Sequence, residues 1–299
     1  MKKKSIIIST LLICSMLFST TPVIFGNYAS ATTGAANFLP NAFYDNATIG
    51  GFDTLNEVQR SQNATYYITS LLKGRYGNSN CFEKMNGSAT KGDYQSTLNL
   101  LRTNYDNAVV FSKGHRTVQF NHPGLIPSHN QNGSFGTTWY LLDYEIYPFT
   151  STKNTVTFMW HCQTAYNYTG NGVIPMLGGD YFGLPYCFTH NPSMSRYGTS
   201  GSQVYLGWED KVNFVIKWPN GTLQPHPFGR AGSPNYEWRI DTKNDYGRVA
   251  ELYWYYMSLN YTTKNALNQV SWDTHNVAFD NSNLKDWLVI WGNGNLQLP

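Results

Sequence analysis

Short apolar runs alternate with segments of helical periodicity along this chain, and the alternation predicts an α/β fold. Runs rich in β-branched and aromatic residues, typical of strands, occupy 107–113, 156–161, 203–208 and 287–291. Apolar residues spaced three and four apart predict helices over 54–73, 93–102, 247–259 and 262–270. This order favours a mostly parallel sheet flanked by helices, the three-layer α/β arrangement.

Two of the strand-like runs end at a reactive side chain. The first leads through Lys113 and Gly114 into His115, and the second leads through His161 into Cys162. Because chemistry in open α/β sheets gathers at the carboxyl ends of the parallel strands, we expect His115 and Cys162 on neighbouring strand ends. A histidine beside a thiol lowers the pKa of the thiol and can protonate a leaving group, so the pair predicts nucleophilic catalysis.

The remaining segments carry weaker patterns. Residues 34–51 lack periodicity, and we interpret 32–52 as a leader or pro-segment. A polar stretch over 122–136 predicts a surface excursion, and 138–147 fits a strand or a short helix. The long Gly- and Tyr-rich segment 166–202 follows Cys162, so we expect it to form one wall of a cleft.

The N-terminus has the features of a secretory signal. Lys2, Lys3 and Lys4 precede an apolar run, and Ala29-Ser-Ala31 fits a cleavage site, so 1–31 is predicted to be removed. An uncleaved membrane anchor is the alternative, but the apolar run is short for a membrane span. We expect a secreted protein without stable membrane insertion, in which 53–299 forms a single domain.

The net charge of the chain becomes balanced once the signal is removed. Loss of the three lysines leaves 18 basic residues against 18 acidic ones, which argues against a nucleic-acid partner. Asn-x-Ser/Thr sequons are compatible with glycosylation outside the cell. They begin at Asn46, Asn63, Asn86, Asn132, Asn167, Asn220 and Asn260.

The cysteines of the mature chain are odd in number. Cys81, Cys162 and Cys187 remain after Cys14 leaves with the signal, which suggests one disulfide and one free thiol. A Cys81–Cys187 disulfide would leave Cys162 free for catalysis, and this is the pairing we predict. The alternative is a Cys162–Cys187 bond across a surface loop.

The two strand ends resemble those of the caspase-like superfamily of cysteine peptidases, which includes legumains, clostripain and gingipains. The family carries an apolar block ending in His-Gly and, about 50 residues later, one ending in Cys. Here 109–115 and 156–165 match these blocks, and the resemblance covers roughly 93–271. It implies a caspase-like three-layer sandwich, a Cys162–His115 dyad, a peptide or protein substrate and no organic cofactor. Backbone N–H groups near Gly114, Arg116, Cys162 and Gln163 would then bind the oxyanion.

Two positions depart from that pattern. Arg116 stands where the family usually has glycine after its histidine, and His161 stands where the residue before the cysteine is usually small. Strand alternation predicts that His161 points away from Cys162, whereas an inward ring would crowd the site. A catalytically inactive relative that binds peptide or glycan is therefore the alternative function.

Two further hypotheses concern charged and metal-binding side chains. Asp180, Glu209 and Asp210 lie in or after segments that could line a cleft, and an acid there would favour substrates with Arg or Lys before the scissile bond. We favour Asp210 among them. A metal site is the competing chemical interpretation, although its spacing is wide for zinc. Its ligands would come from His115, His122, His129, His161 and Cys162.

Overall fold

A six-stranded sheet forms the centre of the protein, in the order β13-β10-β7-β3-β1-β2. Neighbouring strands are parallel from β2 to β10, and only β13 runs antiparallel, against β10. The strands are β1 (Thr33–Pro40), β2 (Cys81–Asn86), β3 (Asn107–Lys113), β7 (Asn154–Trp160), β10 (Val204–Trp208) and β13 (Leu288–Gly292). The predicted α/β class with a mostly parallel sheet is confirmed.

The computed structural model describes most of the chain after the predicted signal. The described residues are 31–40, 55–119, 122–128, 140–161, 164–165, 174–176, 179–181, 183–208, 215–217, 223–225, 246–282, 284–285 and 288–299. The signal predicted over 1–31 therefore lies outside them except for Ala31. Ala31–Pro299 forms one compact unit by its contacts.

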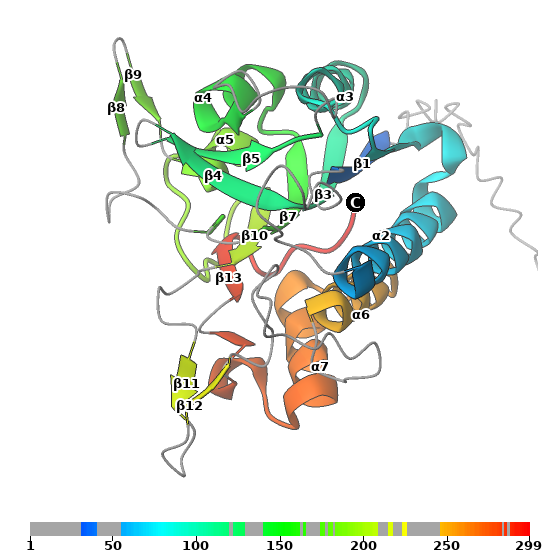
Figure 1. Cartoon of the computed structure of the whole chain (residues 1–299), viewed down its shortest axis with the longest axis vertical. Helices are drawn as coiled ribbons and strands as arrows, with labels where there is room; N and C mark the ends of the chain where they lie inside the picture. Colours follow the sequence, from blue (N-terminus) through cyan, green and yellow to red (C-terminus); the bar gives the residue numbers. More distant parts are fainter. Residues whose placement is uncertain are drawn as a thin grey trace, which may run out of the picture. The chain divides into compact units, whose positions relative to one another are not determined.

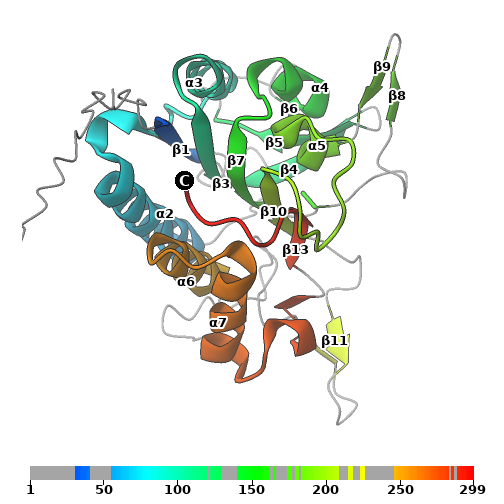
Figure 2. The same ribbon diagram turned by 180° about the vertical axis from the view of Figure 1, so that it is seen from behind.

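Helices cover both faces of the sheet (Figures 1 and 2). One face packs against α2 (Leu55–Tyr76), α6 (Tyr246–Ser258) and α7 (Thr263–His275), and the other against α3 (Lys91–Asn104), α4 (Asp143–Ile146) and α5 (Gly183–Thr189). Strand alternation divides the core accordingly. Val109 and Phe111 of β3 belong to the cluster on the first face, and Ala108 and Val110 to the cluster on the second.

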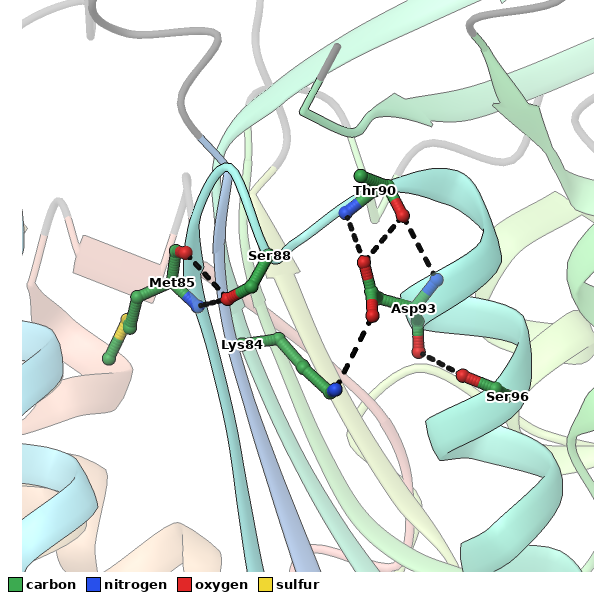
Figure 3. A network of polar contacts seen from close by, with 6 residues as sticks. All are labelled: Lys84, Met85, Ser88, Thr90, Asp93 and Ser96. Atoms are coloured by element: carbon green, nitrogen blue, oxygen red, sulfur yellow. Dashed lines mark hydrogen bonds and ion pairs between the residues drawn. The ribbon is translucent and has the colours of Figure 1, made fainter. Parts of the chain in front are cut away.

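A capping network fixes the start of α3 after β2 (Figure 3). The Thr90 hydroxyl accepts a hydrogen bond from the Asp93 N–H at 3.2 Å, and the Asp93 carboxylate accepts one from the Thr90 N–H at 3.2 Å. This reciprocal pair satisfies two N–H groups that the helix would otherwise leave free. Lys84 of β2 lies 3.3 Å from the same carboxylate, so the cap also ties the helix to the sheet.

Smaller elements lie beyond the carboxyl end of β3 and in the later insertions. β4 (His115–Gln119), β5 (His122–Ile126) and β6 (Leu141–Leu142) form an antiparallel sheet. Two hairpins pair β8 (Ile174–Met176) with β9 (Gly179–Tyr181) and β11 (Val215–Lys217) with β12 (Leu223–Pro225). The 3-10 turns are Asn78–Asn80, Tyr147–Phe149 and Phe279–Asn281.

The leader or pro-segment expected over 32–52 is wrong for its first part. Thr33–Pro40 forms β1, which is buried along its whole length between β3 and β2. Gly34 lies so close to α3 that a Cβ atom there would sit 2.6 Å from Leu101. The segment is short of β-branched residues because close packing demands small ones, and that composition hid the strand.

The surface excursion expected over 122–136 is also wrong at its start, because β5 is buried at His122, Pro123, Gly124 and Leu125. In the segment 138–147 both alternatives occur, since β6 passes directly into α4. The long segment 166–202 contains a buried helix, α5, rather than loop alone. Of the described helices, none is long and apolar enough to cross a membrane.

The disulfide predicted between Cys81 and Cys187 is not formed, and both residues are free thiols. Cys81 begins β2 at the edge of the sheet and packs toward the cluster of α2, α6 and α7. Cys187 lies on α5 within the cluster on the other face, and α5 packs against β7 and β10. A disulfide needs Cα atoms within about 7 Å, which this separation across the sheet does not allow.

Candidate functional site

The site predicted from the sequence lies at the carboxyl ends of β3 and β7. These strands are adjacent and parallel, and their register pairs Lys113 with Trp160 at the last position of each strand. His115 lies two residues after the end of β3. It is the first residue of β4 and pairs with Ile126 of β5. Cys162 and Gln163 lie outside the described residues, although His161 and Thr164 on either side of them are described.

His161 is held in a chain of buried hydrogen bonds. Its Nδ1 lies 3.0 Å from the carbonyl oxygen of His115, and its Nε2 lies 2.7 Å from the hydroxyl of Ser112. The same hydroxyl lies 2.8 Å from the hydroxyl of Tyr94 on α3. Tyr94, Ser112 and His161 are all almost completely buried.

The His161 ring is neutral, which fixes the direction of each hydrogen bond. Burial lowers the pKa of His161 to about 3, and the hydrogen bond to the His115 carbonyl offsets this only in part. A carbonyl can only accept, so Nδ1 carries the proton and donates it, and Nε2 must accept. Ser112 therefore donates to Nε2, and Tyr94 donates to Ser112.

Gly114 owes its identity to the same ring. A Cβ atom at this position would lie 2.5 Å from Cε1 of His161, closer than real contacts allow. The His161 ring thus lies against the backbone of Gly114, directly after β3. It is on the face of the sheet where Ser112 contacts Tyr94. Since Cys162 lies outside the described residues, the expectation that the two side chains point in opposite directions stays a prediction.

One of the predicted oxyanion donors is already engaged. The N–H of Gly114 donates to the carbonyl oxygen of Trp160 at 3.2 Å, continuing the ladder between β3 and β7. The prediction that Gly114 supplies this donor is therefore wrong, because the group is satisfied by the sheet. Arg116 is half-buried within β4, opposite Leu125.

A buried cation lies on the other face of the same strand end. Lys113 has no exposed surface, and its ammonium lies 4.9 Å from the centre of the Trp160 ring. Such a contact stabilises a cation best where water is excluded. Lys113 is not among the site residues predicted from the sequence, although a lysine at the end of an apolar strand is a visible signal.

Among the three acids proposed for a substrate pocket, the described residues include only the backbone of Asp180. The backbone of Asp180 lies in β9, opposite Pro175. Glu209 and Asp210 lie outside the described residues, directly after Trp208, the last residue of β10. β10 borders β7 on the side away from β3.

The described histidines proposed as metal ligands do not gather their side chains into one metal site. His115 and His122 occupy opposite ends of the β4–β5 pairing, His161 is committed to Ser112 and His115, and His129 lies outside the described residues. Among the described residues, no group of three or more His, Cys, Asp or Glu side chains could hold a metal ion.

His122 instead forms a buried pair with Asp143 that sequence reasoning missed. Its Nδ1 lies 2.8 Å from Oδ1 of Asp143 at the start of α4, and Tyr144 packs edge-on against the imidazole. Burial raises the pKa of Asp143 to about 6 even though the histidine lies within hydrogen-bond distance. The pair ties the β4–β5 pairing, whose first residue is His115, to α4.

No protein-family model and no curated protein matches this chain.

Proposed function

We propose that the protein is a secreted cysteine endopeptidase of caspase-like fold, with Cys162 as nucleophile and His115 as general acid and base. The observation that carries the proposal is the pairing of β3 with β7. The two strands are adjacent and parallel and end in register at Lys113 and Trp160. His115 and Cys162 each follow two residues later in the chain.

The chemistry uses only groups of this chain and water. The Cys162 thiolate attacks the carbonyl carbon of the peptide bond, and the C–N bond breaks as His115 gives its proton to the leaving amine. A water molecule, deprotonated by His115, then hydrolyses the thioester and frees the thiolate. The backbone N–H groups of Cys162, Gln163 and Arg116 are the remaining candidates to hold the oxyanion.

The start of the folded unit supports the proposed signal cleavage before Thr32. The backbone N–H and the hydroxyl of Thr32 both donate to the carboxylate of Asp106, at 2.8 and 3.0 Å, and β1 begins at the next residue. Cleavage there would keep every residue of β1. N-terminal sequencing of the exported protein tests this, and an intact Met1 would contradict it.

Labelling with a thiol-reactive probe tests the nucleophile. A catalytic Cys162 should react fast near neutral pH because His115 stabilises its thiolate. Burial raises the pKa of the Cys81 thiol to about 11, so Cys81 serves as a slow internal reference. Equal labelling rates for Cys162 and Cys81 would favour the inactive, peptide- or glycan-binding alternative.

The preference for Arg or Lys before the scissile bond remains part of the proposal, with Asp210 as the acid that would pair with it. A positional-scanning peptide library measures it. Asp210→Asn should reduce cleavage after Arg selectively, whereas Asp106→Asn, a fully exposed acid at the far end of β3, should not. Unchanged Arg cleavage in Asp210→Asn would remove the specificity claim and leave the dyad standing.

A further inference from the structure

We infer that His161 is a positioning residue for His115, acting through a hydrogen-bond chain that begins at Tyr94. The inference rests on the proposed function, because it assigns a role to the residue that precedes the proposed nucleophile. Its structural basis is independent of Cys162. Every group of the chain, from Tyr94 through Ser112 and His161 to the carbonyl of His115, is described.

The position of the ring decides what it can hold. His115 is the junction between the central sheet and the β4–β5–β6 sheet, since β3 ends at Lys113 and β4 begins at His115. The backbone of His115 therefore passes from the central sheet into the pairing with Ile126 of β5. The His161 Nδ1–H binds the carbonyl of this same residue at 3.0 Å, and its ring packs against Gly114.

The ring itself cannot turn without loss. A ring flip that exchanged its carbon and nitrogen atoms would break the bonds at both Nδ1 and Nε2, inside the protein, where no water replaces them. Ser112 donates to Nε2 and accepts from Tyr94, so the order of donors runs in one direction from α3 to His115. The chain thus links a helix, two strands and the proposed general base.

This arrangement gives a role to His161, the residue that departs from the caspase-like pattern before the cysteine. A small residue before the cysteine leaves the space beside Gly114 empty, whereas His161 fills it and binds the backbone of the neighbouring strand. The bulky side chain therefore packs on the face of the sheet where Ser112 lies. It stiffens the junction at His115.

Two variants of equal shape separate positioning from packing. His161→Asn keeps an amide donor near the place of Nδ1, and His161→Leu has the same shape without the donor. We expect His161→Leu to lose about 10- to 100-fold in kcat with a small change in KM, since a shift of about 1 Å in a catalytic group can cost 10²-fold. His161→Asn should recover most of that loss, and Ser112→Ala should fall between the two.

The pH dependence of Cys162 alkylation by iodoacetamide gives a readout besides turnover. In the wild type the alkylation midpoint should lie well below 8.5, and in His161→Leu it should move toward that value as His115 loses its place. A low midpoint in the wild type that is unchanged in His161→Leu and Ser112→Ala overturns the positioning role alone. A wild-type midpoint of about 8.5 overturns the proposed dyad itself.

Urea denaturation of each variant shows whether the substitution has destabilised or unfolded the protein. If His161→Leu does not fold, Ser112→Ala, which removes one hydroxyl, carries the test. Equal kcat and equal alkylation midpoints in folded His161→Asn and His161→Leu would contradict the inference, because the donor would then have no effect.

Discussion

At the scale of single residues, the neutral ring of His161 makes the stability of the protein depend on pH. Its pKa is about 3 in the folded protein and about 6.5 in an unfolded chain, so the unfolded state binds more protons between these values. Its contribution is complete above pH 6.5 and is lost as the pH falls toward 3. By pH 5 the loss amounts to about 2 kcal/mol.

A comparison with His161→Asn isolates this effect, because asparagine does not titrate and all other groups are shared. Between pH 7.5 and pH 5, the free energy of unfolding of the wild type, measured in urea, should fall by about 2 kcal/mol more than that of His161→Asn. A difference between the two proteins that stays constant across this range would show that His161 titrates alike in the folded and unfolded states, and would contradict the buried neutral ring.

Gly114 offers a second test at this scale, directed at packing. Gly114→Ala places a Cβ atom 2.5 Å from the His161 ring and should destabilise the protein by about 1–3 kcal/mol. Gly74→Ala is the matched control: Gly74 lies in α2 with open space where a Cβ atom would stand, so alanine should add up to about 1 kcal/mol of stability.

The cause of the Gly114 effect is checked by a double-mutant cycle with His161→Ala. Removal of the ring should make Gly114→Ala nearly neutral, giving an interaction energy of about 1 kcal/mol or more. If alanine costs the same with and without the ring, the glycine is required by the backbone rather than by His161.

At the scale of elements, the central question is whether β1 belongs to the folded domain. β1 lies between β3 and β2 and contributes buried residues to both faces of the sheet, including Ala35 and Ala36. Deletion through Pro40 should therefore abolish cooperative unfolding, because it separates β2 from the sheet. Deletion through Ser30 should leave the thermal transition intact.

Circular dichroism during heating distinguishes these two truncations. A sharp transition in the protein that lacks β1 would restore the interpretation of this segment as a removable leader.

The elements differ in how far their sequences revealed them, for physical reasons. The strands β3, β7 and β10 were visible as short apolar runs because they are buried on both faces of the sheet. The long helices were visible because their apolar residues recur three and four positions apart. β5 was hidden because Pro123 and Gly124 resemble a turn. Gly124 is needed because β6 approaches closely, and a Cβ there would lie 2.7 Å from the Leu141 carbonyl oxygen.

The candidate site was partly visible by the same reasoning. The strand ends that carry His115 and Cys162 could be predicted, since an apolar run that stops at a reactive residue is a local pattern. The contacts of His161 could not, because they join Tyr94 of α3 to Ser112 of β3, and only tertiary packing brings these together. The burial of Asp143 against His122 likewise depends on the packing of β5 against α4.

At the scale of the whole molecule, the sheet separates two hydrophobic clusters. The strands β3 and β7, which precede the two residues of the proposed dyad in the chain, end side by side between these clusters. The free thiols Cys81 and Cys187 pack in or against the clusters and take no part in the proposed chemistry.

The most direct measurement of the central claim is hydrolysis of a mixed fluorogenic peptide library by four purified proteins. Wild type and Cys81→Ala should release the fluorophore at similar rates, and Cys162→Ala and His115→Ala should release none above background. All four should show the same unfolding transition in urea. Hydrolysis that persists in folded Cys162→Ala, or a folded wild type that cleaves no peptide, would contradict the account.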